Sequence, residues 1–217
     1  LPPATSALEF FNGLGGFGAD GTEYVVTLQG DRQTPAPWIN ILANPHFGCQ
    51  LSATGSGYVW SQNSRENQLT SWSNDAVCDP PGDVLYVRDE RSGECWTPTQ
   101  APLPNPNGRY TVRHGRGYSV FEHVAHNLVL TLTVCVPLAD PIRISRLSLR
   151  DTSGRPRRLE VNAYVEWVLG TSRGGSAPFV ITQLDPVTGA LLATNPMNPG
   201  FGGRVAFSDL AGQQTQW

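Results

Sequence analysis

Residues 127–136 (NLVLTLTVCV), 142–150 (IRISRLSLR) and 158–169 (RLEVNAYVEWVL) decide the fold class of this 217-residue chain. In each segment apolar and polar side chains alternate, which is typical of a β-strand with one buried and one wetter face. The connectors Asp140-Pro141 and Ser153-Gly154-Arg155-Pro156 have the length and composition of hairpin turns. The three segments therefore predict consecutive antiparallel strands.

On either side of this stretch, shorter strand patterns recur at regular spacing. The predicted strands are 8–11, 23–29, 38–42, 47–53, 57–60, 84–89, 94–97, 110–114, 118–125, 128–137, 142–151, 158–169, 179–184, 190–194 and 204–208. No window carries an amphipathic helical period with caps, and the glycine- and proline-rich segments 13–21, 99–108 and 170–177 are predicted loops. The sequence predicts an all-β fold, a large antiparallel β-sandwich that forms a single domain over residues 1–217.

The composition excludes several classes of function. Charged residues make up 15% of the chain and the formal net charge is −3, so no overall field attracts nucleic acid or an anionic membrane. All 15 basic residues are arginine, which excludes lysine-based chemistry within this chain. We therefore expect neither a nucleic-acid partner nor direct membrane contact.

The cysteines and histidines form no metal-binding pattern. Cys49, Cys78, Cys95 and Cys135 make no C-x-x-C pair, and none lies at zinc-ligand spacing from a histidine. We expect reduced thiols, no metal and no cofactor. The chain shows no signal peptide and no apolar run near the ~20 residues of a membrane span. Because it also opens without methionine, we interpret it as a piece of a longer protein.

Residues 61–81 hold the candidate site. They carry no strand or helix period, and a compact domain rarely keeps so long an irregular loop unless it serves a site. Amides, a guanidinium, carboxylates and an indole suit a polyhydroxylated ligand, because hydroxyls donate and accept while an indole offers a flat apolar face. A solvated loop that hydrogen-bonds to itself is an equally favoured alternative. The candidate carbohydrate-binding residues are Asn63, Arg65, Glu66, Asn67, Trp72, Asn74, Asp75 and Asp79.

No catalytic motif is assigned. The glycines of 13–18 (GLGGFG) precede a strand, whereas a phosphate loop needs a helix at that point. No G-x-S-x-G sequence supports a serine hydrolase. Glu66, Asp75, Asp79 and Asp83 are close in sequence, but glycoside chemistry needs two carboxyl groups at a fixed separation, one with a raised pKa. We therefore assign no general acid.

Polar side chains on two of the predicted strands favour structural roles. Glu122 and His123 lie on opposite faces of one strand, so one of them faces inward. We expect a buried histidine that is satisfied by a backbone carbonyl. Glu166 is expected to anchor a loop, since an unpaired buried carboxylate is costly. The arginines available to pair with it are Arg113, Arg116 and Arg173.

Four strings carry a family resemblance. They are PWINILANPHFG (37–48), WSQNSRENQLTSWSNDAVCDPPGD (60–83), RYTVRHGRGYSVFEH (109–123) and YVEWVLG (164–170). Together they resemble the start of the phosphorylase-like region of cyclic β-1,2-glucan synthases. That region is grouped in glycoside hydrolase family 94 with cellobiose, chitobiose and β-1,2-oligoglucan phosphorylases. The resemblance covers essentially the whole chain, and its most specific part is the N-S-R-E-N…W-S-N-D…D-P-P-G loop.

The resemblance implies a domain of a multidomain enzyme. Family members begin with a super-sandwich that is shared with mutarotase-like folds, followed by a helical linker, an (α/α)6 barrel and a small β-domain. The barrel carries the general acid and most of the phosphate site, so this chain alone is expected to be inactive. The sandwich packs on the barrel and supports dimerisation. One of its loops, residues 63–79 by position, helps to close the active site on a β-glucan oligosaccharide.

The resemblance also implies a location. In the synthases this module follows a membrane-embedded glucosyltransferase, which places it on the cytoplasmic side of the bacterial inner membrane. Two alternative functions remain open at this point. One is a stand-alone glucan-binding module, and the other is a purely structural or dimerisation scaffold.

Overall fold

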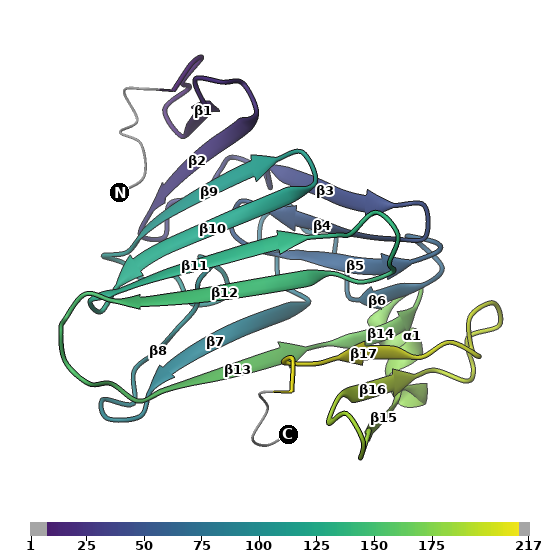
Figure 1. The fold of residues 1–217 in the computed structure, drawn as a ribbon. Coiled ribbons are helices and arrows are strands. Elements are labelled where there is room, and N and C mark those ends of the chain that lie inside the picture. The colour runs from purple at the N-terminus through teal and green to yellow at the C-terminus, as the bar shows by residue number, and fades with distance from the viewer. Residues whose placement is uncertain (1–7, 213–217) are drawn as a thin grey trace.

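The computed structural model describes residues 8–212 as layered β-sheets with very little helix (Figure 1). Every strand pairing among these residues is antiparallel. The elements are β1 (Gly15–Phe17), β2 (Glu23–Gln29), β3 (Ile39–Asn44), β4 (Phe47–Ser52), β5 (Gly57–Ser61), β6 (Gln68–Thr70), β7 (Asp83–Asp89), β8 (Cys95–Trp96), β9 (Arg109–Gly115), β10 (Tyr118–Ala125), β11 (Leu128–Cys135), β12 (Ile144–Asp151), β13 (Leu159–Val165), β14 (Trp167–Gly170), α1 (Arg173–Ser176), the 3-10 turn η2 (Ala177–Phe179), β15 (Ile181–Leu184), β16 (Leu191–Thr194) and β17 (Ala206–Ser208).

The sheets stack in two main layers. The first layer is a six-stranded sheet in the order β1-β2-β9-β10-β11-β12. The second consists of a five-stranded sheet, β14-β6-β5-β4-β3, and a three-stranded sheet, β13-β7-β8. A further small sheet, β15-β16-β17, lies beside β14 near the C-terminal end (Figure 1). The predicted all-β sandwich is confirmed.

The alternation seen in the sequence builds the core between the layers. On β11 the side chains of Leu128, Leu130, Leu132 and Val134 are buried, while the residues between them are partly exposed. Leu132 and Val134 join a cluster with side chains of β3, β4 and β5, and Leu128 and Leu130 pack against β7 and β8. One strand of the first layer thus contacts both sheets of the second, which holds the sandwich together.

The second layer is nearly one continuous sheet. β13 and β14 follow one another with only Glu166 between them, and they pair with β7 and β6. The Glu166 N–H donates to the Gly82 carbonyl at 2.9 Å, so the ladder continues across the junction. Residues 71–82 therefore leave the sheet at the end of β6 and return at the start of β7.

Several predicted boundaries were wrong. The segment 158–169 is two strands, and 61–81 contains the short strand β6. Residues 8–11 contribute only one bridge, from Glu9 to Phe17. The predicted loop 13–21 contains β1, whose glycines fit close backbone packing: a Cβ on Gly15 would lie 2.7 Å from the Val25 carbonyl oxygen. The glycines of this segment were interpreted as loop residues, whereas here they allow a tight strand contact.

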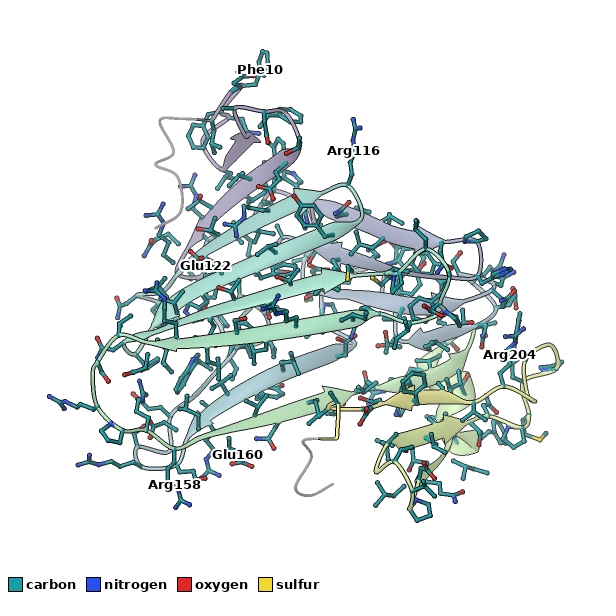
Figure 2. All side chains as sticks on the ribbon, viewed as in Figure 1. Phe10, Arg116, Glu122, Arg158, Glu160 and Arg204 are labelled. Carbon is teal, nitrogen blue, oxygen red and sulfur yellow. The ribbon has the colours of Figure 1, made fainter. Side chains whose placement is uncertain are left out.

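The buried histidine of β10 is confirmed. His123 is fully buried, and its Nδ1 lies 2.7 Å from the Thr97 carbonyl oxygen. Glu122 lies on the opposite, outer face of the first sheet (Figure 2).

A second histidine, His114 of β9, has its Nδ1 2.9 Å from the Ser119 hydroxyl, and its Nε2 is buried without a partner. Burial lowers the pKa of His114 to about 4.

Acid should destabilise the domain through His114. Above its ordinary pKa of 6.5 the imidazole is neutral in both the folded and the unfolded state. Between 6.5 and about 4 the unfolded chain binds a proton that the folded chain does not, so the free energy of unfolding falls. The slope from this group is about 1.4 kcal/mol per pH unit. Urea unfolding of the wild type and His114→Gln at about pH 7.5 and about pH 5 measures it. If the free energy of unfolding falls by the same amount in both proteins between these pH values, His114 is not the group responsible.

Candidate carbohydrate-binding loops

The eight candidate residues lie on two separate arms rather than on one loop. The first arm, residues 62–67, connects β5 to β6 and carries Asn63, Arg65, Glu66 and Asn67. The second arm, residues 71–82, connects β6 to β7. It carries Trp72, Asn74, Asp75 and Asp79.

Two amides build the first arm. The Asn63 Oδ1 accepts hydrogen bonds from the N–H groups of Arg65 and Glu66, both at 2.9 Å. Asn67 is buried, and its Nδ2 donates to the Ser61 carbonyl at 2.9 Å. Asn63 and Asn67 are therefore used by the fold itself, as the self-bonded alternative expects.

The charged side chains of the first arm face solvent. The Arg65 Nε and Glu66 Oε1 are 3.5 Å apart, with side-chain exposures of 88% and 51%. Such an exposed ion pair is worth little and is easily opened. Both groups are consequently available to a ligand.

Two carboxylates build the second arm. The Asp75 Oδ1 accepts from the N–H groups of Val77 and Cys78 at 2.9 Å, and these bonds, that from Cys78 first, lower its pKa. The Asp79 Oδ2 accepts from Ser52 Oγ at 2.6 Å and from Thr54 Oγ1 at 2.8 Å. Asp79 thus pins this arm to the turn after β4. A lowered pKa is the opposite of what a general acid needs, so Asp75 is unsuited to that role.

The second arm presents an indole and an amide. The Trp72 ring is 43% exposed and stacks on Tyr58 of β5 with the ring centroids 5.2 Å apart and an interplanar angle of 17°. The buried Tyr58 also packs on Trp60, so the inner face of the exposed Trp72 indole is held by buried aromatic rings. Asn74 is exposed, with φ at +51°, and its amide makes no hydrogen bond to any described residue. An apolar face beside a free amide suits a sugar ring.

A polar cluster joins the second arm to α1, and sequence reasoning found it only in part. The Glu166 Oε1 lies 2.6 Å from Arg173 Nη2 and accepts from the Tyr164 hydroxyl at 3.3 Å. Its Oε2 accepts from Ser71 Oγ at 3.4 Å. The expected anchoring role of Glu166 is confirmed, with Arg173 as the arginine partner. Tyr164 and Ser71 were missed because nothing in the sequence shows that their hydroxyls meet the Glu166 carboxylate.

A third segment supports the first arm and was also missed. The Asn198 Nδ2 donates to the Glu66 carbonyl at 3.4 Å and to the Leu169 carbonyl at 3.0 Å. Asn198 belongs to a proline- and glycine-rich turn, 195–203, which has no strand or helix period to locate it in space. The turn ties the arm to the end of β14.

Within residues 8–212 no three or more histidine, cysteine, aspartate or glutamate side chains come together in a group that could hold a metal ion. All four cysteines are free thiols, and burial raises the pKa of Cys49 to about 11, which keeps it protonated and unreactive. None of the described helices is long and apolar enough to cross a bilayer.

Comparison with known proteins finds one family and several relatives. The family described as "Glycosyl hydrolase 94, supersandwich domain" matches residues 22–217. The chain is 43% identical over 209 residues to the cyclic beta-(1,2)-glucan synthase NdvB of Rhizobium meliloti (strain 1021), covering 94% of this chain and 7% of that protein.

Two phosphorylases are also similar. An N,N'-diacetylchitobiose phosphorylase of Vibrio furnissii is 31% identical over 155 residues, which are 70% of this chain and 19% of that protein. A solabiose phosphorylase of Paenibacillus borealis is 30% identical over 167 residues, which are 72% and 20%. The chain therefore spans about a fifth of the phosphorylases and 7% of the synthase.

The division between fold-building and available residues predicts unequal stability effects. Asp79→Ala removes the acceptor of two hydroxyls and should lower the free energy of unfolding by about 1–3 kcal/mol. Arg65→Ala removes an exposed side chain and should change it by about 0.5 kcal/mol or less. Urea unfolding of both variants measures the difference. A loss in Arg65→Ala as large as that in Asp79→Ala would show that the first arm is also structural.

Proposed function

The chain belongs to the supersandwich domain of the glycosyl hydrolase 94 family, and on that basis we propose that it is the accessory sandwich of a glucan-active enzyme. In this role it packs on a catalytic (α/α)6 barrel of the same longer protein. Its two arms contribute to a site for a β-glucan oligosaccharide. The relatives are a glucan synthase and two disaccharide phosphorylases, which supports a saccharide as the ligand class.

The observation that carries this proposal is that both arms are fixed to the sandwich while several of their polar groups face solvent unused. Asn67 and Asp79 fix the arms to the sandwich, so their outward groups are held without depending on a ligand. Arg65 and Glu66 on the first arm and Asn74 on the second then present donors and acceptors that the fold does not use, and the second arm adds the exposed Trp72 ring. Preorganised polar groups around an aromatic face bind a polyhydroxylated ligand at low entropic cost.

The arms bind rather than catalyse. Asp75, a carboxylate of the second arm, has a lowered pKa and remains ionised at neutral pH. General acid catalysis needs a protonated group positioned on the leaving oxygen. We therefore assign proton transfer to the barrel and orientation of the glucan to the arms of this domain.

The proposal extends to partners and location. The barrel and a second copy of the chain are the protein partners, and the relatives' greater length leaves room for the barrel. If the longer protein also contains the membrane-embedded glucosyltransferase that the family resemblance implies, this domain lies on the cytoplasmic side of the bacterial inner membrane. The formal charge of −3 gives the domain itself no attraction to anionic lipid.

Arg65→Ala tests the proposal in the longer protein. Removing a charged group that contacts the bound glucan should cost about 2–5 kcal/mol of binding free energy. Arg91→Ala is the matched control, since Arg91 is an exposed arginine on the β7–β8 turn. Isothermal titration with β-1,2-glucan oligosaccharides measures both affinities. Unchanged affinity in Arg65→Ala, with the fold intact, would leave the first arm a structural feature.

The isolated chain should neither hydrolyse nor phosphorolyse β-1,2-glucan oligosaccharides, because the proposed proton donor lies on the barrel. Product analysis after prolonged incubation, with and without phosphate, measures this. Turnover that disappears when one of the chain's own carboxylates, such as Glu66, is replaced by glutamine would refute the division of labour.

A further inference from the structure

A row of polar and aromatic side chains lies on the outer face of the second layer, beyond the two arms. Leu159 and Val161 of β13 pack on the inner cluster of Val87 and Trp96, so the alternate residues of β13 and β7 face outward. We call the six outward residues the outer strip. They are Glu160, Asn162 and Tyr164 on β13, and Val84, Tyr86 and Arg88 on β7.

Two tyrosines of the outer strip flank an amide that the fold does not use. Tyr86 lies directly opposite Asn162, and Tyr164 lies opposite Val84, so the two tyrosines are diagonal neighbours. Tyr164 is 47% exposed and Tyr86 is half-buried. Asn162 is exposed, and its amide makes no hydrogen bond to any described residue. Two phenol rings beside a free amide offer apolar faces together with a donor and an acceptor.

The outer strip is joined to the second arm through Glu166. The Tyr164 hydroxyl donates to Glu166 Oε1 at 3.3 Å, and Ser71, the first residue of the arm, donates to Oε2 at 3.4 Å. Arg173 Nη2 lies 2.6 Å from the same carboxylate. The strip therefore begins at the root of the second arm. It follows the seven residues of β13 for about 20 Å, at about 3.3 Å per residue, which is room for several sugar rings.

The charges of the outer strip cancel. Arg88 Nη1 lies 3.7 Å from Glu160 Oε2, and Glu160 projects near the start of β13 (Figure 2). At the other end Arg173 neutralises Glu166. The one aliphatic residue of the strip, Val84, is buried. A neutral polyhydroxylated ligand fits such a surface better than an anion, or than the apolar centre of a protein interface.

We propose that the outer strip is a second saccharide subsite, which binds the part of a long β-glucan chain that extends beyond the arms. Tyr164 and Tyr86 stack on sugar rings, and Asn162 hydrogen-bonds to sugar hydroxyls. The inference rests on the proposed function for its ligand class, and it adds a dependence on chain length. A disaccharide fills only the site at the arms, whereas a longer oligosaccharide also reaches the strip.

Tyr164→Ala in the longer protein tests this dependence. We expect its affinity for a β-1,2-glucan hexasaccharide to fall about tenfold, while its affinity for the β-1,2-linked disaccharide stays the same. Isothermal titration measures both, and urea unfolding checks the fold. Tyr118→Ala is the matched control, since Tyr118 also lies on the outer face of a sheet and donates to a carboxylate, that of Glu23, at 2.7 Å. Unchanged hexasaccharide affinity in Tyr164→Ala would overturn the inference.

Tyr164→Phe separates the ring from the hydroxyl. It keeps the stacking surface but removes the hydrogen bond to Glu166, so it should bind the hexasaccharide with nearly the wild-type affinity. A loss as large as that in Tyr164→Ala would show that Tyr164 acts through Glu166 and the second arm, and would overturn its contact with the glucan.

Arg65→Ala separates the strip from the arms. If Arg65→Ala weakens the binding of both ligands and Tyr164→Ala weakens neither, the arms bind glucan and the strip does not. If Tyr164→Ala weakens hexasaccharide binding and Arg65→Ala has no effect, the strip binds glucan and the first arm does not. Wild-type binding in both variants would refute both proposals.

Thiol labelling shows whether the strip is open to a ligand. Asn162→Cys places a thiol at its centre, which should react with a maleimide in the free longer protein and more slowly with saturating hexasaccharide. Peptide-resolved mass spectrometry separates this site from the exposed native Cys78 and Cys95. A thiol that is unreactive without glucan would mean that protein covers the strip, and equal rates with and without glucan would mean that glucan does not. Either result would overturn the inference.

Discussion

The hydrogen bond from the Glu166 N–H to the Gly82 carbonyl is the constraint on which the candidate site depends. It keeps the β13–β7 pair and the β14–β6 pair in one ladder, although residues 71–82 leave the sheet between them. The Glu166 side chain then reaches Ser71 at the exit of this arm and Arg173 on α1. One residue thus holds the register of the layer and fixes the root of the second arm.

A backbone bond at this point has consequences for the arm that a flexible loop would not have. Both ends of the arm are fixed within one ladder, and Asp79 pins its middle to Ser52 and Thr54. The conformational entropy of the arm is therefore lost on folding rather than on ligand binding. This is why the exposed Trp72 and Asn74 matter: they are presented by a segment that is already ordered.

The sequence predicted the long strands well, because alternation over eight residues is a strong signal. The strand 118–125 coincides with β10, and the inward leucines of β11 follow the expected period. The three-residue strands β1 and β6 were not predicted, since so short a run cannot show an alternation of apolar and polar residues. The strand break at Glu166 was missed because the alternation runs through it, and the break depends on Gly82, which is distant in sequence.

The sequence predicted which polar residues the candidate loop contains, but not which of them the fold uses for its own hydrogen bonds. Asn63 and Arg65 looked alike as polar loop residues, yet the first closes a turn and the second faces solvent. Which polar groups the fold consumes depends on tertiary contacts, such as that between Asp79 and Ser52, and these have no signature in the sequence.

The arginine-only composition explains where the sandwich is closed and where it stays open. Arg143 donates two hydrogen bonds, at 2.9 and 2.7 Å, to Asp83 and so links the start of β12 to the start of β7. Arg157 donates through Nε and Nη2 to Asp89 at the end of β7. A planar fork can make such paired bonds, whereas a lysine ammonium is a single point of charge. Arg157 also donates through Nη1 to the His126 carbonyl between β10 and β11, so each fork ties the two layers at one end of β7. The long side between them, along β12 and β13, has no such tie among the described residues and is lined there by an open hollow.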